Sequence, residues 1–265
     1  MFSLVVTVTI AIVISSDRFL FTHGSQQATP GQFTYQAFLR KGGDQFVCSA
    51  VIIQCQFLLT AAHCTVGEDP HEFQVIVGTI FSTGNNGTAY KVARFIEHDR
   101  YNASTNEFDM ALIKTSAIID FNSFVLPAPM NHYINYEWFP NVTVSGWEML
   151  NCSVAEKLQY TEMKVNLLTE STAHQHYGNY LQTTGSSCPI VSNGEPLVNN
   201  GFLIGVAGGL PCSIYNTTLF ADVSATAHAA WIINAMNIPL KIYSAIIQRG
   251  IHKCCDPCPT QRSSV

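Results

Sequence analysis

The chain has 265 residues, enough for one large all-β domain or two small domains. Charged residues make up only 12%, the formal net charge is −5, and no basic stripe occurs, which excludes a nucleic-acid partner. Hydrophobic residues make up 47%, enough for a sizeable core. No motif for a cofactor occurs, so none is expected.

The first 16 residues predict a cleaved signal peptide. The stretch from Met1 to Ser15 is almost wholly apolar, is too short to span a bilayer comfortably, and ends in small and polar residues. An uncleaved signal anchor is the less favoured alternative. We therefore expect a secreted, extracellular protein with no membrane span in the mature chain.

Cysteines and glycosylation sequons agree with export. The chain holds nine cysteines, which suits an oxidising compartment. Asn-x-Ser/Thr acceptors predict glycans on a surface that has few charges of its own. These acceptors are Asn86, Asn102, Asn141, Asn151 and Asn216.

Short apolar runs separated by turn residues predict the strands of a many-stranded β-barrel or sandwich. The runs are Gln45–Ile53, Phe57–Ala61, Gln74–Val77, Met110–Ile113, Val142–Val144, Leu197–Val198 and Phe202–Val206. One helix is expected over Ser224–Met236, which is rich in alanine. Residues 237–265 form a tail of different composition, which ends in a cluster of cysteines followed by a short polar stretch.

The tail cysteines do not predict a metal site. Cys254, Cys255 and Cys258 offer three thiols with only His252 nearby, whereas structural zinc takes four ligands, usually in two spaced pairs. Disulfides are favoured in an oxidising compartment. We therefore expect no metal.

Two motifs point to a known family. Leu58-Leu59-Thr60-Ala61-Ala62-His63-Cys64 closely resembles the histidine motif of trypsin-like serine proteases, peptidase family S1. Phe108-Asp109-Met110-Ala111-Leu112-Ile113 resembles the aspartate motif of that family, in the expected order after the histidine. In such a site a buried carboxylate orients the imidazole and stabilises its protonated form.

The resemblance covers Thr22 to about Met236 and implies an all-β fold of two six-stranded antiparallel β-barrels with a C-terminal helix. Accordingly, we expect a protease-like domain over residues 22–236 and a separate tail over 237–265. Further segments that carry the likeness are Gly31–Gln36, His98–Tyr101, Val144–Trp147, Pro196–Val198 and Leu203–Val206.

The family's disulfides imply two pairs here, Cys48–Cys64 and Cys188–Cys212. Five cysteines stay unassigned, and this odd number leaves one for a free thiol or an interchain disulfide. The five are Cys55, Cys152, Cys254, Cys255 and Cys258.

The serine motif departs from the family. The family has Gly-Asp-Ser-Gly-Gly-Pro, whereas this chain has Cys188-Pro-Ile-Val-Ser-Asn-Gly-Glu-Pro196. Counting forward from the cysteine places Ser192 at the nucleophile, and counting back from the proline places Asn193 there. An amide cannot replace an alkoxide, so the second alignment abolishes acyl-enzyme chemistry. Both alignments lose the aspartate before the serine, and an oxyanion-hole glycine becomes Ile190 or Val191.

The activation device is missing as well. The family has Arg followed by Ile-Val-Gly-Gly, and this chain has Phe21-Thr22-His23-Gly24-Ser25 at that place. The missing aspartate is the family's partner for the new terminal amine. Both halves of one salt bridge are therefore lost together, as expected of a chain that no longer uses activation.

The specificity pocket is also altered. Ser186 falls at its base, and Gly208-Gly209 replaces the family's Ser-Trp pair. Leu210 and Thr218 stand where trypsin-like pockets have glycines, and they predict a filled or reshaped pocket.

Together these departures predict a secreted, catalytically inactive serine protease homologue. It would bind a protein partner, namely a protease, a substrate or a receptor, or would regulate proteolysis. One alternative is an active or weakly active serine endopeptidase that uses His63, Asp109 and Ser192. Another is a structural role as a disulfide-linked, glycosylated surface component.

Overall fold

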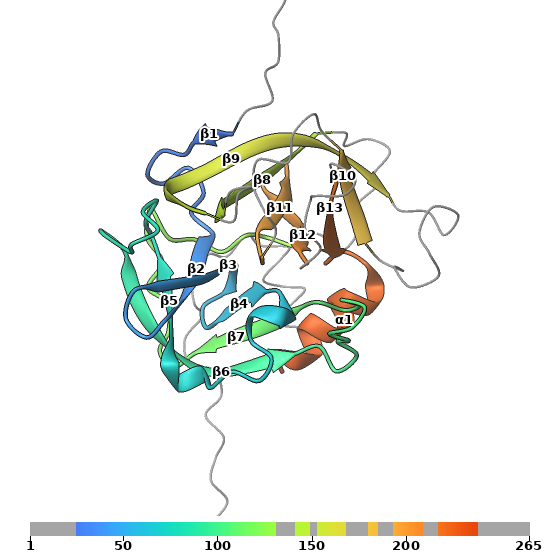
Figure 1. Ribbon diagram of the computed structural model, residues 1–265, viewed down its shortest axis with the longest axis horizontal. Helices are drawn as coiled ribbons and strands as arrows, with labels where there is room; N and C mark the ends of the chain where they lie inside the picture. The colour runs from blue at the N-terminus through green and yellow to red at the C-terminus, as the bar shows by residue number, and fades with distance from the viewer. Residues whose placement is uncertain are drawn as a thin grey trace, which may run out of the picture.

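A computed structural model of the chain describes residues 25–130, 141–148, 153–167, 180–184, 193–208 and 217–237. The described part is built from antiparallel strands, short 3₁₀ turns and one α-helix, which follows the last strand (Figure 1). The all-β fold class expected from the sequence is thus confirmed.

The first half of the chain forms a closed six-stranded barrel in the order β2-β3-β4-β7-β6-β5. Its strands are β2 (Gln36–Lys41), β3 (Gln45–Gln54), β4 (Phe57–Thr60), β5 (Phe73–Val77), β6 (Thr88–Glu97) and β7 (Ala111–Thr115). Its interior is filled by β-branched, leucine and aromatic side chains that alternate along the strands, as a half-buried sheet requires.

The second half forms a sheet in the order β9-β10-β13-β12-β11-β8, and a further β8–β9 pairing joins the two ends of this run of six. The short strand β1 (Gln26–Gln27) pairs with the outer edge of β9. The other strands are β8 (Asn141–Glu148), β9 (Val154–Leu167), β10 (Tyr180–Thr184), β11 (Pro196–Asn199), β12 (Phe202–Ala207) and β13 (Thr217–Asp222). The two six-stranded sheets confirm the expected barrels.

The hairpin between β11 and β12 shows how local sequence sets the register. Asn199 pairs with Phe202, so only Asn200 and Gly201 form the loop. Both have positive φ values, 47° and 82°, which a two-residue Asn-Gly turn adopts readily. The turn therefore fixes the strand that leads back toward the site.

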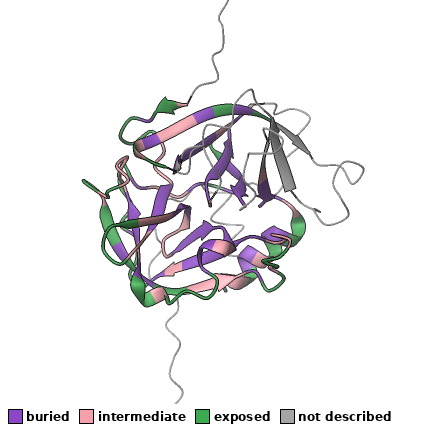
Figure 2. Cartoon of the chain, viewed as in Figure 1, coloured by how far each residue is buried: buried purple, intermediate pink, exposed green. Residues whose placement is uncertain are grey.

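Helix α1 (Thr226–Ala235) packs against both halves of the molecule. Asp222 Oδ1 accepts hydrogen bonds from the Ser224 and Ala225 amides and from the Ser224 hydroxyl, which fixes the turn into the helix. Part of the helix surface is buried (Figure 2). The buried residues include Ile232 and Ile233, in one cluster with strand residues of both barrels. No helix in the described ranges is long and apolar enough to cross a membrane.

Candidate functional site

His63 lies on a short 3₁₀ turn, η1 (Ala62–Cys64), which is separated from the end of β4 by Ala61 alone. A disulfide joins Cys48 of β3 to Cys64 of this turn. The pairing implied by the family resemblance is therefore present, and it holds the imidazole at the edge of the first barrel. The His63 side chain is about one-quarter exposed, since 25% of its surface remains accessible.

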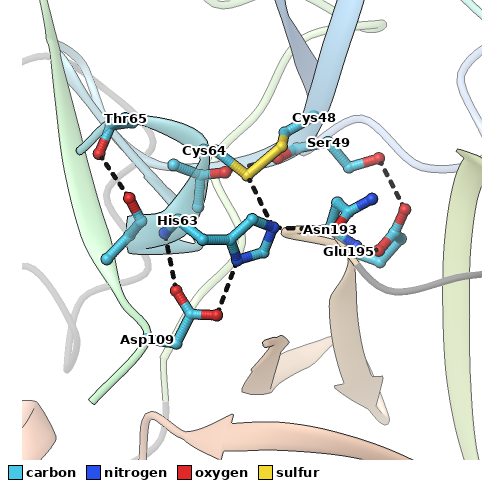
Figure 3. Close-up of polar contacts among 10 residues, drawn as sticks. Cys48, Ser49, His63, Cys64, Thr65, Asp109, Asn193 and Glu195 are labelled. Carbon is cyan, nitrogen blue, oxygen red and sulfur yellow. Dashed lines mark hydrogen bonds and ion pairs between the residues drawn. A yellow bond between two sulfur atoms is a disulfide. The ribbon is translucent and has the colours of Figure 1, made fainter. Parts of the chain in front are cut away.

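Asp109 is fully buried and directs both carboxylate oxygens at His63 (Figure 3). Oδ2 accepts from the ring Nδ1 at 2.7 Å, and Oδ1 accepts from the His63 backbone amide at 2.9 Å. The carboxylate thus fixes both the ring and the turn that carries it. Gly208 lies against the same carboxylate, because a Cβ at this position would stand 3.3 Å from Asp109 Oδ2.

The other ring nitrogen of His63 meets an amide. Asn193 Oδ1 lies 2.8 Å from Nε2, on the side of the ring opposite Asp109 (Figure 3). An oxygen accepts, so in this arrangement Nε2–H donates, and Nδ1–H donates to the carboxylate, which makes the ring an imidazolium. If the amide is turned over, its NH₂ donates to a neutral ring instead. An asparagine therefore satisfies Nε2 in either protonation state, and it offers no alkoxide.

The backbone around Asn193 is fixed from both barrels. Ser49 of β3 donates its amide to the Asn193 carbonyl at 2.9 Å, and Gly194 donates its amide to the Ala207 carbonyl at 3.1 Å. Gly194 has a φ of +85°, and a Cβ there would stand 2.3 Å from the Ser49 carbonyl oxygen. Only a glycine fits this close approach between the two barrels.

Glu195 was missed by the sequence interpretation. Its side chain is fully buried, Oε2 accepts from the Asn193 backbone amide at 2.5 Å, and Oε1 accepts from the Ser49 hydroxyl at 3.3 Å. A signal did exist in the sequence, because Glu195 stands where the family motif, counted back from Pro196, has the glycine directly before its proline. A charged residue in a motif of small residues was a reason to ask what it binds.

Comparison with known proteins places the chain in a family. The family model described as Trypsin matches residues 22–232. The chain belongs to the trypsin family. It is 30% identical over 230 residues to trypsin alpha of Drosophila erecta, which covers 81% of this chain and 87% of that one. It is also 30% identical over 213 residues to transmembrane protease serine 9 of Rattus norvegicus, covering 72% of this chain and 20% of that one.

Solved structures of other serine-protease-like chains share the fold. Neuropsin of mouse brain aligns with a TM-score of 0.67 at 20% identity, covering 80% of this chain and 98% of that one. Human heparin binding protein aligns with a TM-score of 0.65 at 21% identity, covering 82% of this chain and 97% of that one. At this identity the likeness supports the trypsin-like fold alone.

Of the residues that the trypsin resemblance singled out, the structure brings together His63, Asp109, Asn193 and Gly208. Thr218 lies in β13, where its backbone pairs with Thr183 of β10. The remaining predicted site and disulfide residues lie outside the described ranges. These are Ser186, Ser192, Leu210, Cys188 and Cys212.

Some of the predicted glycosylation sites and remaining cysteines lie within the described ranges, and others lie outside them. Asn86 and Asn102 are exposed, and Asn141 begins β8. Cys55 is disulfide-bonded, like Cys48 and Cys64. The others lie outside the described ranges, namely Asn151, Asn216, Cys152, Cys254, Cys255 and Cys258.

One cluster of metal-ligating residue types occurs at the site, formed by Cys48, His63 and Cys64, whose candidate ligand atoms lie within 4.8 Å of one another. Both sulfurs are bonded to each other, and a disulfide sulfur is not the thiolate that a metal needs. The cluster therefore belongs to the framework of the histidine turn.

Proposed function

We propose that this trypsin family member is a secreted, catalytically inactive homologue that acts by binding a protein partner or by regulating proteolysis. The observation that carries the proposal is the 2.8 Å contact between His63 Nε2 and Asn193 Oδ1. In a working triad this ring nitrogen takes the proton of the serine hydroxyl. An amide in the same place accepts or donates a hydrogen bond but does not form an acyl-enzyme.

The His63–Asp109 pair then has a structural task. Asp109 is fully buried, and a buried carboxylate is costly unless it is hydrogen-bonded. The ring and the backbone amide of His63 supply two of its bonds. Retention of triad-like geometry is therefore compatible with loss of catalysis.

The altered segments of the sequence support the same proposal. The aspartate that precedes the family's serine is absent, and so is the Ile-Val-Gly-Gly terminus that would pair with it. A protein partner, namely a protease, a substrate or a receptor, would dock on the loops around the former cleft. Secretion follows from the signal peptide predicted over residues 1–16 and agrees with the disulfides.

A second candidate is a weak serine endopeptidase with Ser192 as the nucleophile. The short His63–Asp109 contact, 2.7 Å between Nδ1 and Oδ2, favours it because such a pair orients a general base. The contact with Asn193 weighs against it, since the base nitrogen is already engaged.

Hydrolysis of a diverse peptide library separates the two candidates. We expect the natural chain to cleave no more bonds than its His63→Ala variant, with active trypsin as the positive control. Cleavage that is lost in both His63→Ala and Ser192→Ala would replace the proposal with the endopeptidase. The exposed His71→Ala variant is the matched control for a histidine change remote from Asp109.

A further inference from the structure

A buried acid holds the backbone amide of residue 193. Glu195 Oε2 accepts from the Asn193 N–H at 2.5 Å, and no part of the Glu195 side chain reaches solvent. In the trypsin-type site the amide of the nucleophile residue itself is one of the two donors to the oxyanion of the tetrahedral intermediate. Residue 193 stands at His63 Nε2, so its amide is the counterpart of that donor.

We propose that Glu195 is a built-in anion that takes the oxyanion-binding amide, so that this cleft rejects a tetrahedral oxyanion even when a serine stands at position 193. The inference deepens the proposed function and rests on it. Glu195 would therefore prevent catalysis in a second way, separate from the loss of the nucleophile.

The chemistry of the contact makes the block effective. An amide carries a single proton, and Glu195 Oε2 receives it. A hydrogen bond accepted by an ionised carboxylate is charge-assisted and stronger than a neutral one. A substrate oxyanion would have to displace this carboxylate oxygen. It would also come to rest beside the negative charge of a buried carboxylate, which solvent screens less than an exposed one.

The carboxylate is also anchored away from the cleft. Ser49 Oγ of β3 donates to Glu195 Oε1 at 3.3 Å (Figure 3). The backbone carbonyl of Glu195 accepts from the Ala207 amide at 2.9 Å. Ser49 is itself hydrogen-bonded within the first barrel, because Thr60 Oγ1 of β4 donates to the Ser49 carbonyl at 2.8 Å. Glu195 is therefore held between the two barrels and is not displaced by a simple rotation into solvent.

Restored reactivity tests the block. The test compares Asn193→Ser with the double variant Asn193→Ser/Glu195→Gly, whose second change restores the family's glycine. The double variant Asn193→Ser/Asp120→Asn is the control, because it removes a negative charge at an exposed site. The probe is a fluorophosphonate. The serine oxygen bonds to phosphorus, fluoride leaves, and the hydroxyl proton passes to His63.

We expect Asn193→Ser and its Asp120→Asn control to react slowly and alike, and removal of Glu195 to raise the rate about 10²-fold, the usual weight of one oxyanion donor. A purely structural Glu195 predicts the opposite sign, because its loss would loosen the loop and slow the reaction. The proposal is overturned if removing Glu195 leaves the rate within about threefold, or if neither variant reacts above a His63→Ala background.

A measurement without catalysis covers the case in which Glu195→Gly fails to fold. Hydrogen exchange of the Asn193 amide is measured by NMR in the natural chain and in Glu195→Gln, which keeps the size of the side chain and removes its charge. We expect exchange to quicken about tenfold or more, since the charge-assisted bond becomes a neutral one. Unchanged exchange would contradict the proposal. Labelling of the natural chain at Ser192 would overturn the proposed function and, with it, this inference, whereas unchanged Asn193 exchange would overturn only the role of Glu195.

Discussion

Position 193 decides what His63 can do. The ring is held on one side by Asp109 Oδ2 at 2.7 Å and on the other by Asn193 Oδ1 at 2.8 Å. The histidine is therefore part of a continuous polar chain that runs from the Asp109 carboxylate to the Asn193 amide. In such a chain the histidine contributes to stability by satisfying a buried charge, and this can be measured.

Replacement of His63 by alanine should destabilise the fold. The buried Asp109 carboxylate would lose its ring partner and keep only the backbone amide and any remaining bonds. We expect the free energy of unfolding to fall by about 2–4 kcal/mol, from urea titration. His71→Ala, at an exposed position, should leave it nearly unchanged. A His63→Ala variant as stable as the natural chain would show that the pair is not structural.

Gly194 carries a second prediction. A Cβ there would stand 2.3 Å from the Ser49 carbonyl oxygen and 2.5 Å from Thr60 Oγ1, in addition to the strain of a φ of +85°. Gly201 has nearly the same φ, +82°, but a methyl group at that position would meet open space. We expect Gly201→Ala to lower the free energy of unfolding by roughly 1 kcal/mol, measured by thermal unfolding. Gly194→Ala should lower it by at least about 2 kcal/mol more. Equal losses would mean that the barrels separate easily at this point.

Among the elements, the loop before Asp109 and helix α1 meet in an aromatic cluster. The His98 ring stacks on Phe108, with ring centroids 4.8 Å apart, and lies 4.8 Å from the Trp231 ring of the helix. The Arg100 guanidinium lies 4.1 Å above the Phe108 ring on the loop side. His228 of α1 stands 6.0 Å from His98 and is fully buried. The element that positions Asp109 is therefore coupled to the C-terminal helix.

This cluster makes the fold sensitive to acid. Burial lowers the pKa of His98 to about 4, with smaller lowering by His228 and Arg100, while the nearby Asp99 carboxylate opposes the shift. Burial likewise lowers the pKa of His228, opposed by its contact with the Asp222 carbonyl and carboxylate. An unfolded histidine titrates near 6.5, so between pH 6.5 and 4 the unfolded chain binds more protons.

The free energy of unfolding should therefore fall by about 1–3 kcal/mol in total as the pH drops from about 6.5 to 4. Denaturant titrations at a series of pH values measure this change. His98→Asn removes this titration and keeps an acceptor for the Arg100 amide, which now donates to His98 Nδ1 at 3.1 Å. The variant should flatten the pH profile, and the exposed His71→Asn should not. A profile with the same slope in His98→Asn would refute the role of this cluster.

The predictable elements were those with contiguous apolar runs. The runs that became β3, β4 and β12 lie deep in the barrels, where both faces are covered, and α1 begins and ends within two residues of its expected bounds. Strands β6 and β9 were not among the predicted runs. They alternate apolar with charged residues such as Lys91 and Lys164, because one face of each strand is exposed, and this dilutes the apolar signal.

For the molecule as a whole, the family motifs were sufficient to predict the two barrels and the terminal helix. The apolar cluster shared by the barrels and α1 includes Val51 and Leu112 from the first, Val206 from the second, and Ile232 from the helix. The site was predictable only in part, since the count of residues around the serine motif was ambiguous by one. In the structure, contacts between the two barrels place Asn193 beside His63. The spacing of residues along the chain does not reveal such contacts.

The central claim is that the cleft contains no reactive nucleophile, and covalent labelling of the natural chain tests it most directly. The protein is treated with a fluorophosphonate before and after exposure to trypsin, digested, and mapped by mass spectrometry beside active trypsin and the His63→Ala variant. We predict no phosphonylated peptide above the level of His63→Ala. A phosphonyl group on Ser192 that disappears in His63→Ala would contradict the account and establish a working serine site.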